Sequence, residues 1–396
     1  MRYMNEVGLD EISNMLEPFL TTTTVNLDEC LGEILSSDII AQKSLPCFDN
    51  TALDGYAYNY ADRGKKLKIL GTILAGDKSV YEIKSGQCYK IMTGAIFPKG
   101  ADTIVRLEDA KFDGEFLVPD NDTKQFNALR YAGEEIKKGE ILLKKGEILT
   151  PALAMYLASQ GITKIEVAKK PSIAIFSTGD EIKEPWEEAD ESEIYNANAT
   201  GISAVLAKFG FKSQYIGIIK DDFNQTLQRL KDASENFDVI ITSGGASKGE
   251  ADFMHRALSS LDFTQTLNGI KIVPGGGPTK CYKKGSKLAF VLPGNPMAAF
   301  LMTYLITIPV LFRALGKKDF LYQKVRANLK GSLQLKPNRS NIVYGIYENG
   351  EFIPTNTKFG SGMIRPLVES NAMLVSKFNQ TKLENEQILE ILLTKV

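Results

Sequence analysis

The pattern of hydrophobic and polar positions divides this chain into segments of different character. Between residues 170 and 292, short apolar runs rich in β-branched residues alternate with longer segments of helical period. Runs such as PSIAIF, QYIGII and FDVII are typical of buried strands. Because strands and helices alternate at this spacing, the pattern predicts a doubly wound parallel α/β domain. Its expected helices cover 198–209 and 223–236 and begin again at Asp252, and further strands are expected at 270–273 and 288–292.

The flanking parts of the chain predict a different architecture. Residues 66–150 consist of short alternating segments separated by Gly, Asp and Lys, which is typical of a small β domain. Before it, residues 5–20 have the period of an amphipathic helix, and residues 27–40 predict a short helix followed by a strand. Gly-punctuated strands after residue 317 predict a second β domain at the C-terminal end.

Two more helices are predicted from local signals. One covers 151–161, because Thr150 is a favourable N-cap and Pro151 suits the first helical position. The other lies in the apolar run 297–315, which is interrupted by threonines and a proline. This run predicts a buried core helix rather than a membrane span.

Charge and composition narrow the possible functions. The chain has 47 basic and 48 acidic residues, interspersed along its length, so it has no electrostatic footprint for nucleic acid. The N-terminal stretch MRYMNEVGLDEISN has no apolar core and does not resemble a signal peptide. Four scattered cysteines without a CxxC pair suggest reduced thiols and a cytoplasmic location. The single histidine, His255, argues against a histidine-rich zinc site and against a Ser–His–Asp triad.

Candidate chemistry follows the predicted strands, at the turns where they end. In an open parallel sheet the carboxyl ends of the strands lie at one edge, and ligands bind there. We therefore expect four turns to line a single rim: STGDE at 177–181, KDD at 220–222, SGGASKGEAD at 243–252 and LPGNP at 292–296. The acids that this rim would carry are Asp180, Glu181, Asp221 and Asp252.

The composition of the rim predicts an anionic ligand together with a metal ion. Gly244 and Gly245 let backbone N–H groups approach a ligand closely, and a following helix N-terminus favours anionic oxygens. Convergent carboxylates repel an anion unless a cation intervenes, and Mg²⁺ commonly joins one or two carboxylates to a phosphate. Two other interpretations stay open: a tight turn without a ligand, and acids that only cap helices, as the positions of Asp222 and Asp252 allow.

The loop LPCFDNTALDGYAYNY, residues 45–60, combines apolar and acidic residues. A solvated turn has no need of Phe48, Leu53 and Tyr56, so this loop is a candidate functional segment. The alternative is a packed connector stabilised by Asx-turns. In the adjoining β domain, the segment IMTGAIFPKGAD places Thr93 at the end of a predicted strand.

Seven segments spread over nearly the whole chain resemble one known family. In chain order they are FDNTALDGYA, TGAIFPKGADTIV, AGEEIKKGE, STGDEI, IYNANA, SGGASKGEADF and LPGNP. They resemble the MoeA family of molybdopterin molybdenumtransferases, to which the C-terminal domain of gephyrin is similar. The resemblance implies Mg²⁺-dependent insertion of molybdate into adenylylated molybdopterin, with release of AMP. It also implies an elongated homodimer with its active site between the α/β domain of one subunit and the partner subunit.

The resemblance implies four domains. Residues 1–54 and 138–168 would form an elongated N-terminal dimerisation domain, and residues 55–137 a small β domain. Residues 169–316 would form the doubly wound molybdopterin-binding domain, and residues 317–396 a C-terminal β-barrel. We expect a cytoplasmic protein that works with molybdopterin adenylyltransferase and with molybdoenzyme maturation proteins, without nucleic-acid or membrane partners.

Carried over by motif, the resemblance also assigns site residues. The catalytic acids would be Asp54, Glu135, Glu181, Asp221 and Asp252, of which Glu181, Asp221 and Asp252 would bind the metal. The substrate-binding residues would be Thr93, Ser243, Gly244, Gly245, Ser247, Lys248, Pro293, Gly294, Asn295, Pro296, Arg339 and Ser361. Glu135 stands where many members have Asp in a GED triplet, so it keeps the charge with a longer reach.

One motif departs from the family pattern. Where members usually have KPGKP, this chain has VPGGGP at 273–278, without either lysine. Lys248 stands at a position that is usually apolar, and we hypothesise that Lys248, with Lys271 or Lys280, restores part of the lost positive charge. The alternative is an altered activity, such as a preference for tungstate, or a weakened paralogue.

Two other functions stay open from the sequence. Molybdopterin adenylyltransferase shares the doubly wound domain but is normally a single small domain, so the long segment before Lys170 argues against it. A non-catalytic molybdopterin-binding or scaffold protein would keep the fold. The intact set of acids argues against a scaffold, and the missing lysines favour it.

Overall fold

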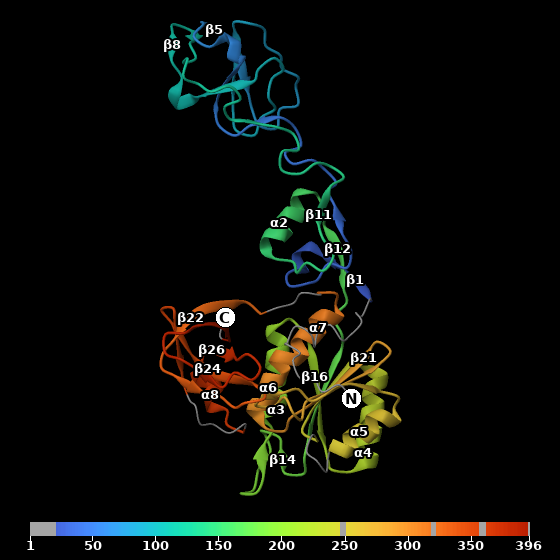
Figure 1. The fold of residues 1–396 in the computed structure, drawn as a ribbon. Coiled ribbons are helices and arrows are strands. Elements are labelled where there is room, and N and C mark those ends of the chain that lie inside the picture. Colours follow the sequence, from blue (N-terminus) through green and yellow to red (C-terminus); the bar gives the residue numbers. More distant parts are fainter. Residues whose placement is uncertain (1–20, 246–250, 318–321, 356–361, 395–396) are drawn as a thin grey trace.

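The computed structural model describes residues 21–245, 251–317, 322–355 and 362–394. Figure 1 shows an elongated molecule with an α/β domain and a β-barrel side by side at one end. A slender middle part follows, and a small β domain lies at the far end. The chain runs through the middle part twice, so the small β domain is inserted between its two passes.

The α/β domain is built on a six-stranded sheet among the described residues, in the order β16-β13-β17-β21-β20-β18. Neighbouring strands from β16 to β21 are parallel, and β20 and β18 are antiparallel at the edge. The bounds are β13 (Ile173–Thr178), β16 (Ser213–Ile219), β17 (Val239–Ser243), β18 (Thr264–Asn268), β20 (Lys280–Lys284) and β21 (Lys287–Leu292). The doubly wound domain is confirmed, but a wholly parallel sheet is wrong.

Two local features explain that correction. A two-residue turn with Gly285 at φ +57° joins β20 to β21, and such a turn returns the chain as a hairpin. The strand expected at 270–273 is shorter, β19 (Ile272–Val273), and it does not join this sheet. It pairs with the start of a barrel strand, so it links the α/β domain to the barrel.

Helices cover both faces of the sheet, as a doubly wound fold requires. Along β13, Ile173 and Ile175 pack into one core cluster with α3 (Ala197–Lys208), α6 (Pro296–Met302) and α7 (Ile308–Ala314). The alternate residues, Ala174 and Phe176, pack into the opposite cluster with α4 (Phe223–Asn236) and α5 (Ala251–Ser260). Strands that are buried on both faces account for the near-continuous apolar runs in the sequence.

The long apolar run forms a core helix, which confirms the prediction. α6, a π-helical turn (Thr303–Thr307) and α7 are continuous from Pro296 to Ala314. By length and composition this helix could span a membrane, but 89% of its most apolar window is buried inside the fold. Thr303 is fully buried and its hydroxyl donates to the Ala299 carbonyl (2.8 Å), so its polar group is satisfied within the helix.

The C-terminal part is a barrel. Its strands are β22 (Lys324–Leu329), β24 (Ser340–Glu348), β25 (Glu351–Pro354), β26 (Ala372–Val375) and β28 (Ile388–Leu393). They pair in the order β24-β25-β22-β28-β26, and β26 pairs again with β24, which closes the ring. A short pair, β23 (Leu333–Gln334) with β27 (Lys382–Leu383), and the helix α8 (Arg365–Glu369) complete the described residues of this part.

The middle part consists of short antiparallel pairs and one helix. β1 (Thr22–Asn26) pairs with β12 (Lys164–Ala168), and β2 (Ile39–Ile40) pairs with β11 (Ile141–Leu143). The predicted helix is confirmed as α2 (Pro151–Ser159), capped by the hydroxyl of Thr150, which accepts from the Leu153 N–H. The amphipathic helix expected over 5–20 lies outside the described residues.

The helix expected in the first part of 27–40 is only a 3₁₀ turn, Leu27–Glu29. The residues that follow are bound instead to the second pass of the chain. The Gly32 N–H donates to the Leu149 carbonyl (2.9 Å), and the Leu35 N–H donates to the Glu147 carbonyl (3.0 Å). These long-range bonds hold the segment extended, which overrides its local helical period.

The small β domain is confirmed. Its sheet runs in the order β7-β4-β6-β5-β9-β8, and a two-stranded pair, β3 with β10, lies at its base. The bounds are β3 (Asn50–Thr51), β4 (Gly55–Tyr58), β5 (Leu67–Ile73), β6 (Gln87–Ile91), β7 (Thr103–Arg106), β8 (Phe112–Asp113), β9 (Phe116–Leu117) and β10 (Leu129–Arg130).

Candidate functional site

A cavity of about 320 Å³ lies where β13, β17 and β21 end. We call it the rim cavity. The turns that follow these strands and the first turn of α3 line it, together with Pro278 and two short strands, β14 (Ile182–Lys183) and β15 (Ile194–Tyr195). The structure thus brings together three of the four turns that the sheet topology predicts for one rim. Its lining includes the predicted site residues Glu181, Gly244, Gly245, Pro293, Gly294, Asn295 and Pro296.

Glycines let these turns approach one another. Gly244 has φ +97°, and a Cβ atom there would lie 2.6 Å from the Thr178 carbonyl oxygen. Gly179 has φ +137°, and a Cβ atom there would lie 2.7 Å from a carboxylate oxygen of Glu181. A larger residue at Gly244 would push the turns after β13 and β17 apart, and one at Gly179 would displace the Glu181 carboxylate.

Asn198, in the first turn of α3, bridges two walls of the cavity. Its side-chain N–H₂ donates to the Ser243 hydroxyl and to the Gly294 carbonyl, both at 2.6 Å. Ser243 itself is fully buried at the end of β17. The sequence analysis did not single out Asn198, although it lies in the IYNANA segment that carries part of the family resemblance.

A second polar group is centred on Asn196, which also lines the cavity. The Asn196 side chain, 4% exposed, caps α3 and accepts from the Ser177 hydroxyl (2.9 Å). Its N–H₂ lies 2.8 Å from the Tyr215 hydroxyl and 3.2 Å from the Glu184 carboxylate. Burial and the neighbouring Glu184 raise the pKa of Tyr215 above its usual range. Nothing in the sequence pointed to Glu184 or Tyr215, because their proximity depends on the fold.

The predicted acids have different surroundings at the rim. Glu181 is exposed and lines the cavity, and its carboxylate makes no ion pair with any residue in the described part of the chain. The Asp221 N–H donates to the Asp180 carboxylate at 3.4 Å, so the KDD turn adjoins the GDE turn. Asp222 caps α4 by accepting from the Gln225 N–H (2.7 Å). The expectation that this acid serves as a helix cap is therefore confirmed. Asp252 follows the first residue of α5, and its side chain is outside the described atoms.

The remaining acids lie elsewhere in the molecule. The Thr93 N–H and hydroxyl both donate to one oxygen of Asp54 (2.6 Å each), and these bonds lower the pKa of Asp54. This pair belongs to the small β domain, at the opposite end of the molecule from the rim (Figure 1). Glu135 lies in the connection between the small β domain and the middle part, and its N–H donates to the Leu45 carbonyl (3.0 Å). A single chain therefore does not bring Asp54, Thr93 or Glu135 to the rim cavity.

The barrel contacts the α/β domain at β19 and, near the rim, at Asn295. The Ser340 N–H donates to the Lys271 carbonyl (2.8 Å), and a Cβ atom at Gly362 would lie 3.9 Å from the Asn295 side chain. Arg339 precedes Ser340, and its guanidinium donates to the Pro337 carbonyl (3.2 Å). Ser247, Lys248 and Ser361 lie outside the described residues.

The first two glycines of the VPGGGP segment are closely packed, whereas Gly277 is exposed. A Cβ atom at Gly275 would lie 3.0 Å from the Ala298 side chain, and one at Gly276 would lie 2.6 Å from the Ile270 and Ile272 carbonyl oxygens. The Lys271 ammonium lies 5.9 Å from the centre of the Phe378 ring, a cation–π contact. Among the described residues that line the cavity, Glu181 carries the only charge.

A larger cavity, about 620 Å³, lies beside β7 in the small β domain. Charged residues of both signs line it, including the ion-paired Lys111 and Asp120. None of the predicted site residues lines it. The rim cavity is therefore the better candidate, despite its smaller volume.

Comparisons with known proteins place the whole chain in one family. Residues 6–161 match a model of the MoeA N-terminal region (domains I and II), residues 174–313 a probable molybdopterin-binding domain, and residues 326–393 the MoeA C-terminal region (domain IV). The molybdopterin molybdenumtransferase of Haemophilus influenzae is 30% identical over 376 residues, which cover 92% of each chain. The chain belongs to the MoeA family.

Other members agree with this assignment. The molybdopterin molybdenumtransferase of Staphylococcus epidermidis is 28% identical over 381 residues, covering 94% of this chain and 91% of that protein. The crystal structure of the molybdopterin biosynthesis MoeA protein from Pyrococcus horikoshii OT3 superimposes with a TM-score of 0.84. That structure is 27% identical and covers 98% of this chain and all of its own. The MoeA fold and the place of this chain in molybdenum cofactor biosynthesis, both predicted from the seven segments, are confirmed.

Proposed function

We propose that this MoeA-family chain inserts molybdate into adenylylated molybdopterin and releases AMP and the molybdenum cofactor. The observation that carries the proposal is the rim cavity, which combines glycine turns at three strand ends with the exposed carboxylate of Glu181. The backbone N–H of Gly245 is suited to phosphate or molybdate oxygens, whereas the Gly244 N–H already donates to the Leu292 carbonyl (3.1 Å). Ser243 and Asn198 hold two of these turns in a fixed relation.

The donor set at the rim suits Mg²⁺. Hard oxygen ligands from one or two carboxylates, completed by substrate phosphate and water, are its usual environment. Glu181 and the neighbouring Asp221 turn supply such oxygens, with Asp252 as a third candidate. No group of three His, Cys, Asp or Glu side chains converges in the described residues, so substrate oxygens would complete the coordination. When bound, Mg²⁺ would offset the charge on the phosphate oxygens.

The residues of the chain would then act by position and charge. Glycine turns hold the anionic groups, and Glu181 orients the water that adds to phosphorus as the bond to AMP breaks. Histidine chemistry is not needed for this reaction. The lone histidine, His255, lies on α5, and its ring nitrogen is 3.2 Å from the Tyr282 hydroxyl. Neither residue lines the cavity.

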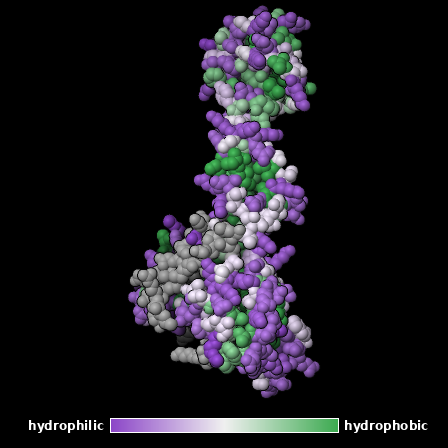
Figure 2. Space-filling model, turned by 90° about the vertical axis from the view of Figure 1, so that its right-hand side faces the viewer, coloured by the Kyte–Doolittle hydropathy of each residue, from purple (hydrophilic) through white to green (hydrophobic). Residues whose placement is uncertain are grey.

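We further propose that the active chain is a homodimer in which a second copy supplies Asp54 and Thr93. One chain holds this pair far from its own rim, which supports a shared site (Figure 1). Hydrophobic surface gathers on the slender middle part, as Figure 2 shows. Exposed apolar side chains there include Leu31, Ile40, Ile141 and Met155. Contiguous apolar surface of this kind is typical of protein interfaces.

The test of the reaction is AMP release from adenylylated molybdopterin by the full chain with Mg²⁺ and molybdate. Wild-type protein should release AMP, and Glu181→Gln should lower kcat at least about 100-fold because it removes the carboxylate from the cavity. Glu188→Gln, the same change at an exposed position of the adjoining loop, is the matched control and should act like wild type. Absence of AMP release by the wild-type chain would refute the proposal.

Mixing two inactive variants tests the shared site. Asp54→Asn and Glu181→Gln should each be inactive alone. If each site draws on two subunits, the mixed dimers contain one intact site, and random reassociation should restore about a quarter of wild-type activity. Failure of the mixture to regain activity, with dimers shown to exchange, would refute the shared site.

A non-catalytic molybdopterin-binding or scaffold protein is the second candidate. The observation that favours it is the charge of the cavity, since no described lining residue is basic and VPGGGP contributes no lysine. Binding of adenylylated molybdopterin without AMP release would support this function. A molybdopterin adenylyltransferase is disfavoured. The chain matches 92% of the length of a molybdopterin molybdenumtransferase, whereas an adenylyltransferase would correspond to the doubly wound domain alone.

The role of the remaining cations can be tested separately. If Lys248 replaces the missing lysines, Lys248→Ala should weaken the binding of molybdate and of AMP esters. Unchanged affinities would rule that role out, and tungstate in place of molybdate would test an altered preference. The cytoplasmic location and the partner proteins, an adenylyltransferase and molybdoenzyme maturation proteins, stay predictions.

A further inference from the structure

Between β13 and α3 the chain leaves the sheet and returns, and we call residues 180–195 the arm. Glu181 is the second residue of the arm. The two short strands of the arm pair as Ile182 with Ile194 and Lys183 with Tyr195. Figure 1 shows β14 projecting from the end of the α/β domain. The only tryptophan of the sequence, Trp186, lies on the arm and is 76% exposed. A segment that protrudes in this way needs an anchor if it is to hold a functional residue still.

The anchor is a polar cluster that joins the arm to the sheet and to α3. The Glu184 carboxylate accepts from the Tyr215 hydroxyl on β16 (2.5 Å) and from the Asn196 N–H₂ (3.2 Å). The Asn196 carbonyl oxygen accepts from the Ser177 hydroxyl on β13 (2.9 Å) and from the Ala199 N–H (3.2 Å). Each side-chain oxygen of Glu184 and Asn196 therefore has a donor. Fully satisfied polar clusters of this kind specify one arrangement of the parts that they join.

The same arm determines where Glu181 lies. The Ile194 N–H donates to the Glu181 carbonyl (2.9 Å), and the Asn196 N–H donates to the Lys183 carbonyl (2.8 Å). These bonds fix both ends of the arm to each other, and Glu184 fixes them to the sheet. The carboxylate of Glu181 has no ion-pair partner of its own among the described residues. Its position over the cavity thus depends on the backbone of the arm.

We propose that Glu184 is a positioning residue that, through Tyr215 and Asn196, holds the arm so that the Glu181 carboxylate faces the rim cavity. The inference rests on the proposed function only for the identity of the ligand that Glu181 meets there. Glu184 does not line the cavity, so its removal should act through Glu181 rather than through the ligand directly.

Trp186 gives a readout that does not depend on activity. In the full chain, Glu184→Gln removes the negative charge and leaves one acceptor oxygen for two donors, and Tyr215→Phe removes the hydroxyl; both should increase fast local motion in the Trp186 anisotropy decay. Glu193→Gln is the matched control, because Glu193 pairs with Lys183 within the arm and does not reach the sheet.

Binding of Mn²⁺ alone, measured by calorimetry, tests the effect on Glu181. Glu184→Gln and Tyr215→Phe should weaken Mn²⁺ binding about 10-fold, as expected for residues that orient a ligand, and Glu181→Gln should weaken it at least as much. Glu193→Gln should bind Mn²⁺ as wild type. A wild-type chain that binds no Mn²⁺, a Glu184→Gln chain that binds it normally, or an unchanged anisotropy decay would each overturn the inference. AMP release by the wild-type chain decides the proposed function independently of these results.

Discussion

The two sheets that carry the candidate site residues are stabilised in different ways. In the α/β domain, β13 and β17 are buried along their whole length, with apolar clusters on both faces. The small β domain has two separate clusters of only six buried residues each among those described. A small sheet with so little apolar burial must draw on other interactions for its geometry.

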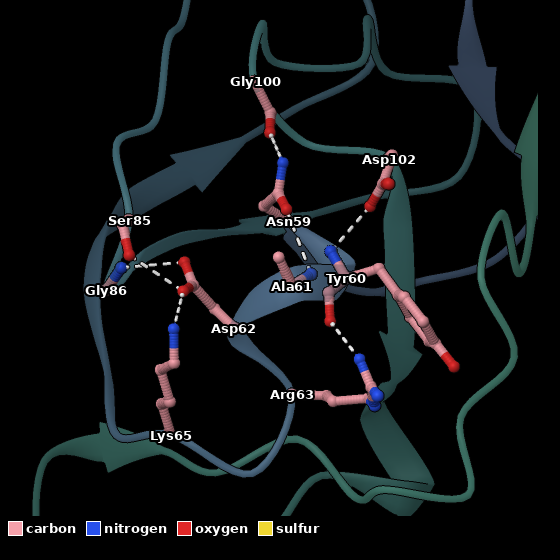
Figure 3. A network of polar contacts seen from close by, with 10 residues as sticks. All are labelled: Asn59, Tyr60, Ala61, Asp62, Arg63, Lys65, Ser85, Gly86, Gly100 and Asp102. Carbon is pink, nitrogen blue, oxygen red and sulfur yellow. Dashed lines mark hydrogen bonds and ion pairs between the residues drawn. The ribbon is translucent and has the colours of Figure 1, made fainter.

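Buried acids in turns supply those interactions. Figure 3 shows Asp62, 2% exposed, accepting from the Ser85 hydroxyl (2.8 Å), the Gly86 N–H (2.9 Å) and the Lys65 ammonium (2.7 Å). The Lys65 side chain is 59% exposed, so its ion pair contributes little, and the Ser85 and Gly86 bonds matter more. Asp102, which is half-buried, also accepts from the Tyr60 N–H (2.7 Å). The α/β sheet is thus held mainly by packing on both faces, whereas the small β domain draws more on hydrogen bonds to acids.

The largest effect should come from the packed sheet. Phe290 on β21 is 1% exposed, and Phe290→Ala should cost about 3–5 kcal/mol of stability because it leaves a cavity between sheet and helices. Hydrogen exchange should show β13 and β17 losing protection while the small β domain is unchanged. Phe116→Ala, at a position 42% exposed, is the matched control. Equal loss of protection in both sheets would contradict the comparison.

A smaller effect, confined to the other sheet, should follow from Asp62→Asn. Leaving buried donors unpaired should cost about 1–3 kcal/mol, seen as faster exchange in β4 and β6 only. Burial tends to raise the pKa of Asp62, but the bonds from Lys65, Gly86 and Ser85 outweigh it, so its pKa in the folded state is lowered. Its contribution is therefore present above about pH 4 and is lost as the pH falls further.

The acid dependence of β4 and β6 protection should accordingly be weaker in Asp62→Asn than in wild type. Asp113→Asn removes only a pair with Lys66 in which both side chains are about 60% exposed, and it should change stability by less than about 1 kcal/mol. If Asp113→Asn and Asp62→Asn were equivalent, hydrogen bonding by buried acids would not be what holds this sheet.

In the small β domain, Thr93→Val should raise the pKa of Asp54 without unfolding the domain. The Thr93 hydroxyl and N–H hold the pKa of Asp54 below its usual range, so removing the hydroxyl should move that pKa upward. Carbon-detected NMR titration of the Asp54 carboxyl measures this directly. Thr72→Val, on the neighbouring β5, should leave the Asp54 pKa as in wild type.

The smallest effect should come from alkylation of the native protein. Cys47 is exposed, whereas burial raises the pKa of Cys88 to about 12 and makes it a poor nucleophile. Iodoacetamide should label Cys47 alone, with a change in stability of less than about 0.5 kcal/mol in either sheet. Mass spectrometry that found Cys88 labelled as fast as Cys47 would show the small sheet opening far more often than its structure implies.

Local features were already determined by the sequence. The helix Phe223–Asn236 has the predicted bounds, and Thr150 and Gly210 mark the ends of two other helices as expected. The rim cavity followed from one topological rule, that parallel strands joined by right-handed crossovers end at the same edge. Hydrophobic periodicity, helix caps and turn residues act over a few neighbouring positions, so they can be recognised in the sequence alone.

Long-range pairing was decided only by the tertiary structure. The departure of β19 to the barrel and the contact between Glu184 and Tyr215 join residues whose partners lie far away in the chain. The same is true of the distance between Asp54 and the rim. Contacts of this kind depend on how whole helices and strands pack against one another. Local helix and strand propensities therefore do not predict them.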